Sequence, residues 1–290
     1  MKNFLWLALF LLPGLGLGMD ARDRSQLLYN QVSQKASHNS YQRKEDLVTQ
    51  LKDFRIRTIE FDAHSKSAPA GDWLVYHNLK DDSTNCRLLS ECYAKVMEFH
   101  KSEPDHDVVT IFFDVDGFNE KGHGKADFYE LIERSFPKGS IVKPADLMSA
   151  CALAKTLQES VTRPGCGWPR LQDLRGKFIL VVTGVPETPK KLGYDIRKDP
   201  VFISCPEIKP ERISIVPDMV FFNMAGPNPL AQSVRQAGFV SRCYWLNHEK
   251  DYQKAMDFSC NLLATDMLDP GLYPWTSTSQ GDGWPFKIIK

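Results

Sequence analysis

Short apolar runs alternate with amphipathic segments along most of the chain. Several runs are apolar at consecutive positions, which is typical of strands in a parallel sheet, because both faces of such strands are covered. Eight runs have the length of a strand: residues 31–37, 55–63, 73–78, 107–116, 177–184, 218–224, 238–247 and 260–267. Amphipathic patterns over residues 88–104 and 125–136 predict helices between strands.

Eight strand candidates separated by helical segments predict an α/β fold, a TIM-type (β/α)8 barrel that is distorted where the spacing is uneven. Residues 136–173 form a long segment with two cysteines, interpreted as an insertion before the fifth strand. A doubly wound open sheet is the alternative, but no Gly-rich phosphate loop follows the first strand. No linker is evident, so residues 19–290 are expected to form a single domain.

The N-terminus has the pattern of a secretory signal peptide. One lysine precedes an apolar run from Phe4 to Leu12, which a Pro-Gly break and small residues follow. We therefore predict a signal peptide over residues 1–18, and a secreted or periplasmic protein. The alternative is an uncleaved membrane anchor, for which the apolar run is short, because a span needs about 20 residues.

The chain has seven cysteines. In an oxidising compartment, Cys86 with Cys92 and Cys151 with Cys166 are disulfide candidates. Cys205, Cys243 and Cys260 leave an odd count, and Cys243 and Cys260 are interpreted as small apolar residues buried in strands. No cysteine or histidine spacing indicates a zinc site.

The charges balance, with 36 basic and 36 acidic residues. Such a chain lacks the basic field that recruits nucleic acid or an anionic surface, so no nucleic-acid partner is expected. We expect a monomer.

Polar residues stand at the ends of the first four predicted strands. They are His38 and Asn39, then Glu60 and Asp62, then His77, then Asp114 and Asp116. In a barrel, functional side chains come from the carboxyl ends of the strands. The oxygen-rich set suits a hard cation such as calcium, and two histidines suit acid–base work on a phosphoryl or ester oxygen. Taken singly, each group also fits a structural histidine, a solvated edge strand or a turn.

Four of these segments carry a resemblance to a known family. SHNSY (Ser37–Tyr41), IEFD (Ile59–Asp62), VYH (Val75–His77) and VTIFFD (Val109–Asp114) resemble successive strand motifs of phosphatidylinositol-specific phospholipase C barrels, of the secreted, calcium-dependent bacterial type. Residues 168–182, 237–247 and 260–267 resemble that family's later strands.

The resemblance implies cleavage of the glycerol–phosphate bond of an inositol phospholipid at a membrane surface, giving diacylglycerol and inositol cyclic phosphate. His38 would stabilise the phosphorane or activate the attacking hydroxyl, and His77 would protonate the leaving glycerol oxygen. Calcium is the implied cofactor, and its ligand positions match a set of four residues. These are Asn39, Glu60, Asp62 and Asp114.

The chain departs from the family at several positions. Asp114 stands where eukaryotic relatives often have Glu, so Asp116 or a water is a candidate to complete the metal site. The calcium-free members carry an Arg on the second strand, where this chain has acids. The apolar run at residues 178–184 lacks a lysine pair for extra phosphates, which favours plain phosphatidylinositol. Arg242 and Trp245 are candidates for substrate contact, with structural packing as the alternative.

Two other functions fit the same residues. One is a metal-dependent phosphodiesterase acting on glycerophosphodiesters or sphingomyelin-type lipids, since head-group specificity lies in loops. The other is a non-enzymatic binding protein on the same barrel. Near the C-terminus, Trp275, Trp284 and Phe286 could touch lipid, or could pack on the barrel.

Overall fold

The structure is a computed structural model that describes residues 24–116, 118, 122–184, 188–206, 209, 212–213, 216–279 and 283–289. The predicted signal peptide lies outside these residues. No helix within the described ranges combines the length and the apolar character that a membrane span requires.

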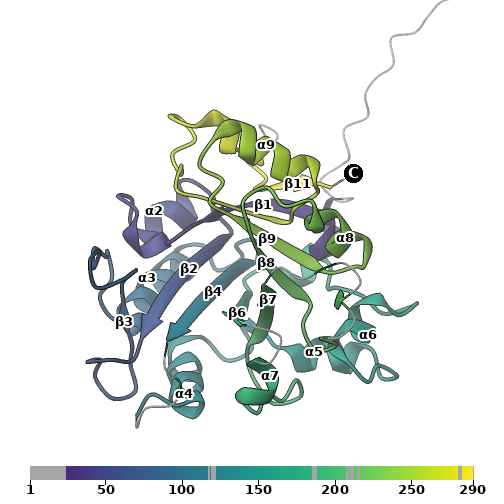
Figure 1. Cartoon of the computed structure of the whole chain (residues 1–290), viewed down its shortest axis with the longest axis horizontal. Helices are drawn as coiled ribbons and strands as arrows, with labels where there is room; N and C mark the ends of the chain where they lie inside the picture. The colour runs from purple at the N-terminus through teal and green to yellow at the C-terminus, as the bar shows by residue number, and fades with distance from the viewer. Residues whose placement is uncertain are drawn as a thin grey trace, which may run out of the picture.

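Eight parallel strands close into a barrel in which chain neighbours are also spatial neighbours (Figure 1). They are β1 (Val32–Ser37), β2 (Thr58–His64), β4 (Val109–Asp116), β6 (Phe178–Thr183), β7 (Phe202–Pro206), β8 (Phe221–Ala225), β9 (Val240–Tyr244) and β10 (Leu262–Thr265). The ring closes because β1 pairs with both β2 and β10. The predicted TIM-type barrel is confirmed.

Three short strands flank the barrel. β3 (Leu74–Val75) pairs antiparallel with β2, β5 (Ile141–Val142) pairs with β6, and β11 (Phe286–Ile288) pairs antiparallel with β1.

Helices surround the strands (Figure 1). They are α2 (Leu47–Lys52), α3 (Leu89–Ser102), α4 (Lys125–Ser135), α5 (Pro144–Ala150), α6 (Leu157–Thr162), α7 (Thr188–Lys191), α8 (Leu230–Gln236) and α9 (Glu249–Asp257). Short 3-10 turns lie at Tyr29–Gln31, Ser40–Gln42, Leu171–Leu174 and Pro274–Thr276.

One of the eight predicted barrel strands was wrong. Residues 73–78 contribute only β3, a two-residue antiparallel pairing inside the β2–β4 connection. The missing barrel strand is β7, whose sequence FISCP is short and ends at a proline. The segment with Cys151 and Cys166 precedes β6 as expected, but β6 is therefore the fourth barrel strand and not the fifth.

The strands near the site alternate between two faces. Ile59 and Phe61 of β2 pack with Ile111 and Phe113 of β4 in an outer core that includes residues of α3 and α4. The intervening positions face the barrel interior, where Phe112 belongs to a second core. Alternation along a strand therefore explains how polar residues occur inside an otherwise apolar run.

Three disulfides are present: Cys86–Cys92, Cys151–Cys166 and Cys243–Cys260. The first two were predicted. The interpretation of Cys243 and Cys260 as isolated apolar residues was wrong, because adjacent strands β9 and β10 bring them together. Cys205, buried in β7, stands outside these disulfides.

The C-terminal aromatic residues pack on the protein. The Trp275 ring contacts Tyr252 of α9, with 5.6 Å between centroids, and Phe286 is fully buried in β11. This agrees with the packing alternative for the C-terminal segment.

Candidate active site

The candidate site begins at the carboxyl ends of neighbouring strands, where β1 lies between β2 and β10. The turn after β1 holds His38 and Asn39, and Asn39 adopts a left-handed backbone with φ 45°. Ser40 ties this turn to the neighbouring strand, because its hydroxyl accepts the Glu60 amide at 2.9 Å and donates to Ser37 O at 3.1 Å. The SHNSY segment therefore fixes two candidate residues against β2.

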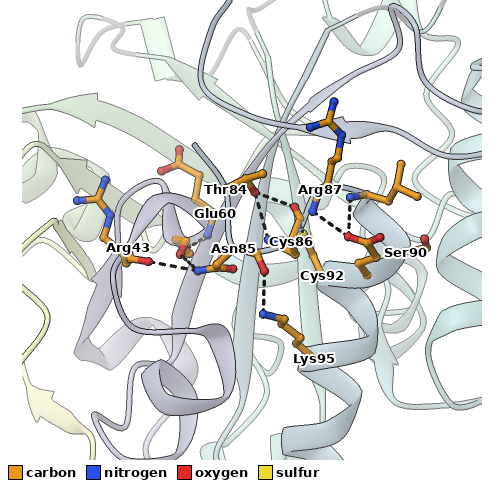
Figure 2. The surroundings of a disulfide bond; sticks show 12 residues. Arg43, Glu60, Thr84, Asn85, Cys86, Arg87, Ser90, Cys92 and Lys95 are labelled. Carbon is orange, nitrogen blue, oxygen red and sulfur yellow. Dashed lines mark hydrogen bonds between the residues drawn. A yellow bond between two sulfur atoms is a disulfide. The ribbon is translucent and has the colours of Figure 1, made fainter. Parts of the chain in front are cut away.

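A loop held by the first disulfide supports the same turn (Figure 2). The Asn85 side-chain amide donates to the carbonyl oxygens of Ser40 and Arg43, both at 3.4 Å. Lys95 Nζ donates to Asn85 O at 2.7 Å. Cys86, the residue after Asn85, anchors the loop to α3 through its disulfide with Cys92.

His38 is paired with a carboxylate that sequence reasoning did not identify. Its Nδ1 lies 3.0 Å from Asp266 Oδ1, just beyond β10. Asp266 also accepts from Arg43 Nη1 at 3.0 Å and from Asn247 Nδ2 at 2.7 Å. Because the carboxylate accepts from Nδ1, the Nε2 of His38 takes no part in this contact.

The charge of Asp266 is stabilised by these neighbours. Burial acts to raise its pKa, but the hydrogen bond from His38 and the charge of Arg43 outweigh burial and hold the pKa below its usual value. The motif CNLLATDM had pointed to the last strand, but it gave no reason to single out its aspartate.

His77 has a similar partner on β2. Its Nδ1 lies 3.2 Å from Asp62 Oδ2 and 3.4 Å from Asn39 Nδ2. One nitrogen cannot donate to the carboxylate and accept from the amide at once, and the shorter, charge-assisted contact with Asp62 is the stronger. The side chain of His77 is 47% exposed, so it faces the mouth of the barrel from the β2–β4 connection.

Glu60 lies deeper and is bound by Arg242. Arg242 Nη2 donates to Glu60 Oε2 at 2.6 Å, and Asn39 N donates to the same oxygen at 3.0 Å. Burial acts to raise the Glu60 pKa, but the charge of Arg242 outweighs it and lowers the pKa. Arg242 also donates to Asn223 at 2.9 Å and lies over the Phe112 and Tyr244 rings.

Asp62 and Asp114 are neighbours across β2 and β4. They are directly paired in the strand register, so their side chains leave the sheet on the same face. Burial raises the pKa of Asp62 to about 6, and the negative charges of Glu60 and Asp114 add to this. Asp116 ends β4, paired in register with His64.

These acids fit a hard cation chemically. Asn39, Glu60, Asp62 and Asp114 offer amide and carboxylate oxygens, and mutual repulsion of the acids is relieved by a bound cation. Both contacts to Glu60 use Oε2, so Oε1 is not engaged by either. Within the described residues, no group of three or more His, Cys, Asp or Glu side chains has the spacing of a formed metal site. These four residues therefore supply suitable oxygen ligands, but they are not arranged as a complete coordination shell.

Two aromatic residues flank His38. The Tyr244 ring lies parallel to it at 6.0 Å between centroids, and the Trp245 indole meets it edge-on at 6.3 Å. Trp245 is 58% exposed, whereas Arg242 is 1% exposed. Of the two candidates for substrate contact, only Trp245 is open to solvent.

No family model and no curated protein matches the sequence. Solved structures do match. One, titled a calcium-dependent phosphoinositol-specific phospholipase C from Pseudomonas sp. in a myoinositol complex, has a TM-score of 0.76 and 23% identity, covering 91% of this chain and 96% of that one.

Two further solved structures share the fold. A Ca²⁺-dependent phosphatidylinositol-specific phospholipase C from Streptomyces antibioticus has a TM-score of 0.66 and 19% identity, covering 82% of this chain and 94% of that one. A phosphodiesterase from Oleispira antarctica, in complex with the product sn-glycerol-3-phosphate, has a TM-score of 0.51 and 11% identity, covering 83% and 95%. At these identities the similarity establishes a common barrel fold.

Proposed function

We propose that the protein is a calcium-dependent phosphoric diester hydrolase that cleaves phosphatidylinositol into diacylglycerol and inositol cyclic phosphate. The observation that carries the proposal is the pair of histidine–carboxylate contacts, His38 with Asp266 and His77 with Asp62, beside an oxygen-rich set at one barrel mouth. The resemblance of the strand motifs and the fold shared with the two phospholipases support it.

His38 acts on the attacking hydroxyl in this proposal. Its Nδ1–H is held by Asp266, so Nε2 is free to accept the proton of the inositol 2-hydroxyl as that oxygen forms its bond to phosphorus. Asp266 balances the charge that the ring then acquires, as a carboxylate partner does for a general-base histidine.

His77 acts on the leaving group. As the bond from phosphorus to the glycerol oxygen breaks, a proton from His77 passes to that oxygen and diacylglycerol leaves. Asp62 fixes the ring through Nδ1 and is placed to balance its positive charge before transfer. In the cyclisation step His38 takes up one proton and His77 releases one, so the protons balance.

Asn39, Glu60, Asp62 and Asp114 are the residues that would hold calcium. When bound, the ion would neutralise charge on the phosphoryl oxygens and lower the pKa of a coordinated hydroxyl. Arg242 would keep Glu60 ionised and oriented.

An inositol head group is favoured by the aromatic neighbours of His38. Tyr244 and Trp245 offer flat apolar surfaces beside the reactive nitrogen, which suit the ring of a cyclic polyol better than a linear glycerol. A glycerophosphodiesterase is the second candidate, supported by the fold shared with the Oleispira phosphodiesterase.

We also propose that the protein is exported. Three disulfides are typical of proteins that fold in an oxidising compartment, and this agrees with the signal-peptide pattern of residues 1–18.

The proposal is tested by product analysis with phosphatidylinositol vesicles, with calcium and with a chelator. We expect calcium-dependent release of diacylglycerol and inositol cyclic phosphate. His38→Ala and His77→Ala should each lower kcat at least about hundredfold, since acid–base catalysis contributes 10²–10⁴-fold. His248→Ala, an exposed histidine before α9, is the matched control and should keep full activity.

Three results would contradict the proposal. Full activity in the chelator would remove calcium from the reaction. Near-normal turnover by both histidine variants would show that the site is elsewhere. Release of glycerol phosphate from glycerophosphodiesters, with phosphatidylinositol left intact, would favour the second candidate.

A further inference from the structure

A buried lysine on β1 lies close to the candidate active site. Lys35 precedes His38 by three residues and is 4% exposed. Its Nζ donates to Leu268 O and to Thr276 Oγ1, both at 2.6 Å. Both acceptors belong to buried residues of the segment that follows β10. The lysine therefore joins two points of that segment to β1.

The same segment begins with the carboxylate partner of His38. Asp266 stands two residues before Leu268, and its Oδ1 lies 3.0 Å from His38 Nδ1. Asn247 binds both the backbone amide and Oδ2 of Asp266, which attaches Asp266 to the β9–α9 connection. Lys35 supplies a second attachment, and it leads to the strand that carries His38. The distance between His38 and Asp266 therefore depends on bonds to two different strands.

We propose that Lys35 is a positioning residue, which sets the contact between His38 and Asp266 by fixing the segment after β10 against β1. An aspartate that moves away from His38 no longer holds Nδ1 or balances the charge of the ring. A displacement of about 1 Å in an active site can lower a rate about hundredfold. The effect on turnover rests on the proposed function, whereas the effect on the contact does not.

The position of Lys35 is costly for an amine. Burial lowers its pKa to about 7, although the negative charges of Asp269 and Glu45 act in the opposite direction. Charged or neutral, the amine has an N–H group for each of its two acceptors. An apolar side chain would avoid the cost of burial, but the buried Leu268 carbonyl would lose this donor. The positioning role therefore depends on the hydrogen bonds and not on the charge.

The first test measures the contact itself by NMR of isotope-labelled histidine side chains. His38→Ala identifies the Nδ1–H resonance of His38 by its disappearance. We expect Lys35→Met to abolish this resonance or to move it upfield, because the proton of a weaker hydrogen bond is less deshielded. The His106 ring, whose Nδ1 lies 2.7 Å from Asp107 O, is the internal reference and should keep its resonances.

Ser33→Ala is the matched control. Ser33 points to the same side of β1 as Lys35 and is also 4% exposed. Its hydroxyl donates at 2.6 Å to Cys260 O, just before β10, so the variant removes a buried bond at the end of β1 away from His38. Both variants should lower the melting temperature, but only Lys35→Met should change the His38 resonance. An equal change in Ser33→Ala, or no change in Lys35→Met, would overturn the inference.

Thr276→Val decides the question if Lys35→Met does not fold. It removes one acceptor of Lys35 and keeps the size of the side chain. The His38 resonance should move in the same direction as expected for Lys35→Met, and by less. A resonance that stays in place would overturn the inference.

The second test measures turnover on phosphatidylinositol vesicles with calcium. Lys35→Met should lower kcat about ten- to hundredfold with KM little changed, because orientation is lost and binding is kept. An unchanged kcat would overturn the positioning role and leave the proposed function intact. If the unmodified protein cleaves no phosphodiester but the His38 resonance still depends on Lys35, the proposed function fails and the positioning of the pair stands.

Discussion

Arg242 illustrates how neighbours decide the role of a residue. The sequence made it a candidate for substrate contact, but its guanidinium is buried between Asn223 and Glu60. Two opposite charges taken out of water stabilise a fold only while both are present. The charge of Arg242 is therefore paired with Glu60 inside the protein rather than presented at the surface.

We predict that Arg242→Met lowers the free energy of unfolding by about 3–5 kcal/mol, because it leaves the Glu60 carboxylate buried without its counter-charge. Urea unfolding measures this. Lys198→Met is the control, since Lys198 is 82% exposed in its pair with Asp195 and should cost at most about 1 kcal/mol. Similar small losses in both variants would show that Arg242 does not sustain the charge of Glu60.

At the scale of elements, β2 and β4 carry all four of the predicted acids, Glu60, Asp62, Asp114 and Asp116. The shared face of Glu60 and Asp62 could be predicted, because side chains two residues apart on a strand point to the same side. The strand after β2 was misassigned because the apolar run around Val75 has strand-like composition but lies in a connection. Barrel strand β7 was missed because five residues ending in proline give a weak pattern.

The connection between α3 and β4 holds a buried histidine that makes stability depend on pH. His106 is 3% exposed, its Nδ1 lies 2.7 Å from Asp107 O, and its Nε2 lies 3.1 Å from His100 Nδ1. If Nδ1 donates to the carbonyl, Nε2 must accept from His100, and a proton on Nε2 would break that contact. Burial lowers the pKa of His106 to about 4.

The sign of the pH effect follows from this depressed pKa. Between its ordinary value of 6.5 and about 4, the unfolded chain binds a proton at His106 and the folded chain does not. Stability is therefore lost as pH falls through this window, by up to roughly 3 kcal/mol from this residue. His106→Gln should show a shallower loss between pH 7 and pH 5 in urea unfolding, and a slope equal to that of the unmodified protein would contradict the prediction.

At the scale of the whole molecule, the candidate site joins distant parts of the chain. His38 and Asp266 are 228 residues apart, and Glu60 and Arg242 are 182 apart. Closure of the barrel brings the first and last strands side by side. A ligand bound at the mouth therefore stabilises the barrel as a unit, because binding favours only the folded state.

We predict that calcium raises the melting temperature through this coupling. At a free concentration 100 times its dissociation constant, calcium should add about 2.7 kcal/mol to the free energy of unfolding. Asp62→Asn and Asp114→Asn should abolish the shift, whereas Asp269→Asn, on the loop after β10, should retain it. An undiminished shift in both site variants would mean that calcium binds elsewhere.

The barrel could be predicted from the sequence, and so could four of the candidate site residues, because alternation and strand-end polarity are local patterns. The SHNSY and IEFD segments name His38, Asn39, Glu60 and Asp62 without any long-range information. Cys86–Cys92 and Cys151–Cys166 were also readable, because each pair is close in sequence.

The tertiary structure shows which residues meet across the barrel. It paired His38 with Asp266, bound Arg242 to Glu60 and joined Cys243 to Cys260. These contacts depend on strand order and register, which no short window of sequence contains. The structure also separated buried aromatic residues such as Phe286 from the exposed Trp245, since burial depends on what packs above a residue.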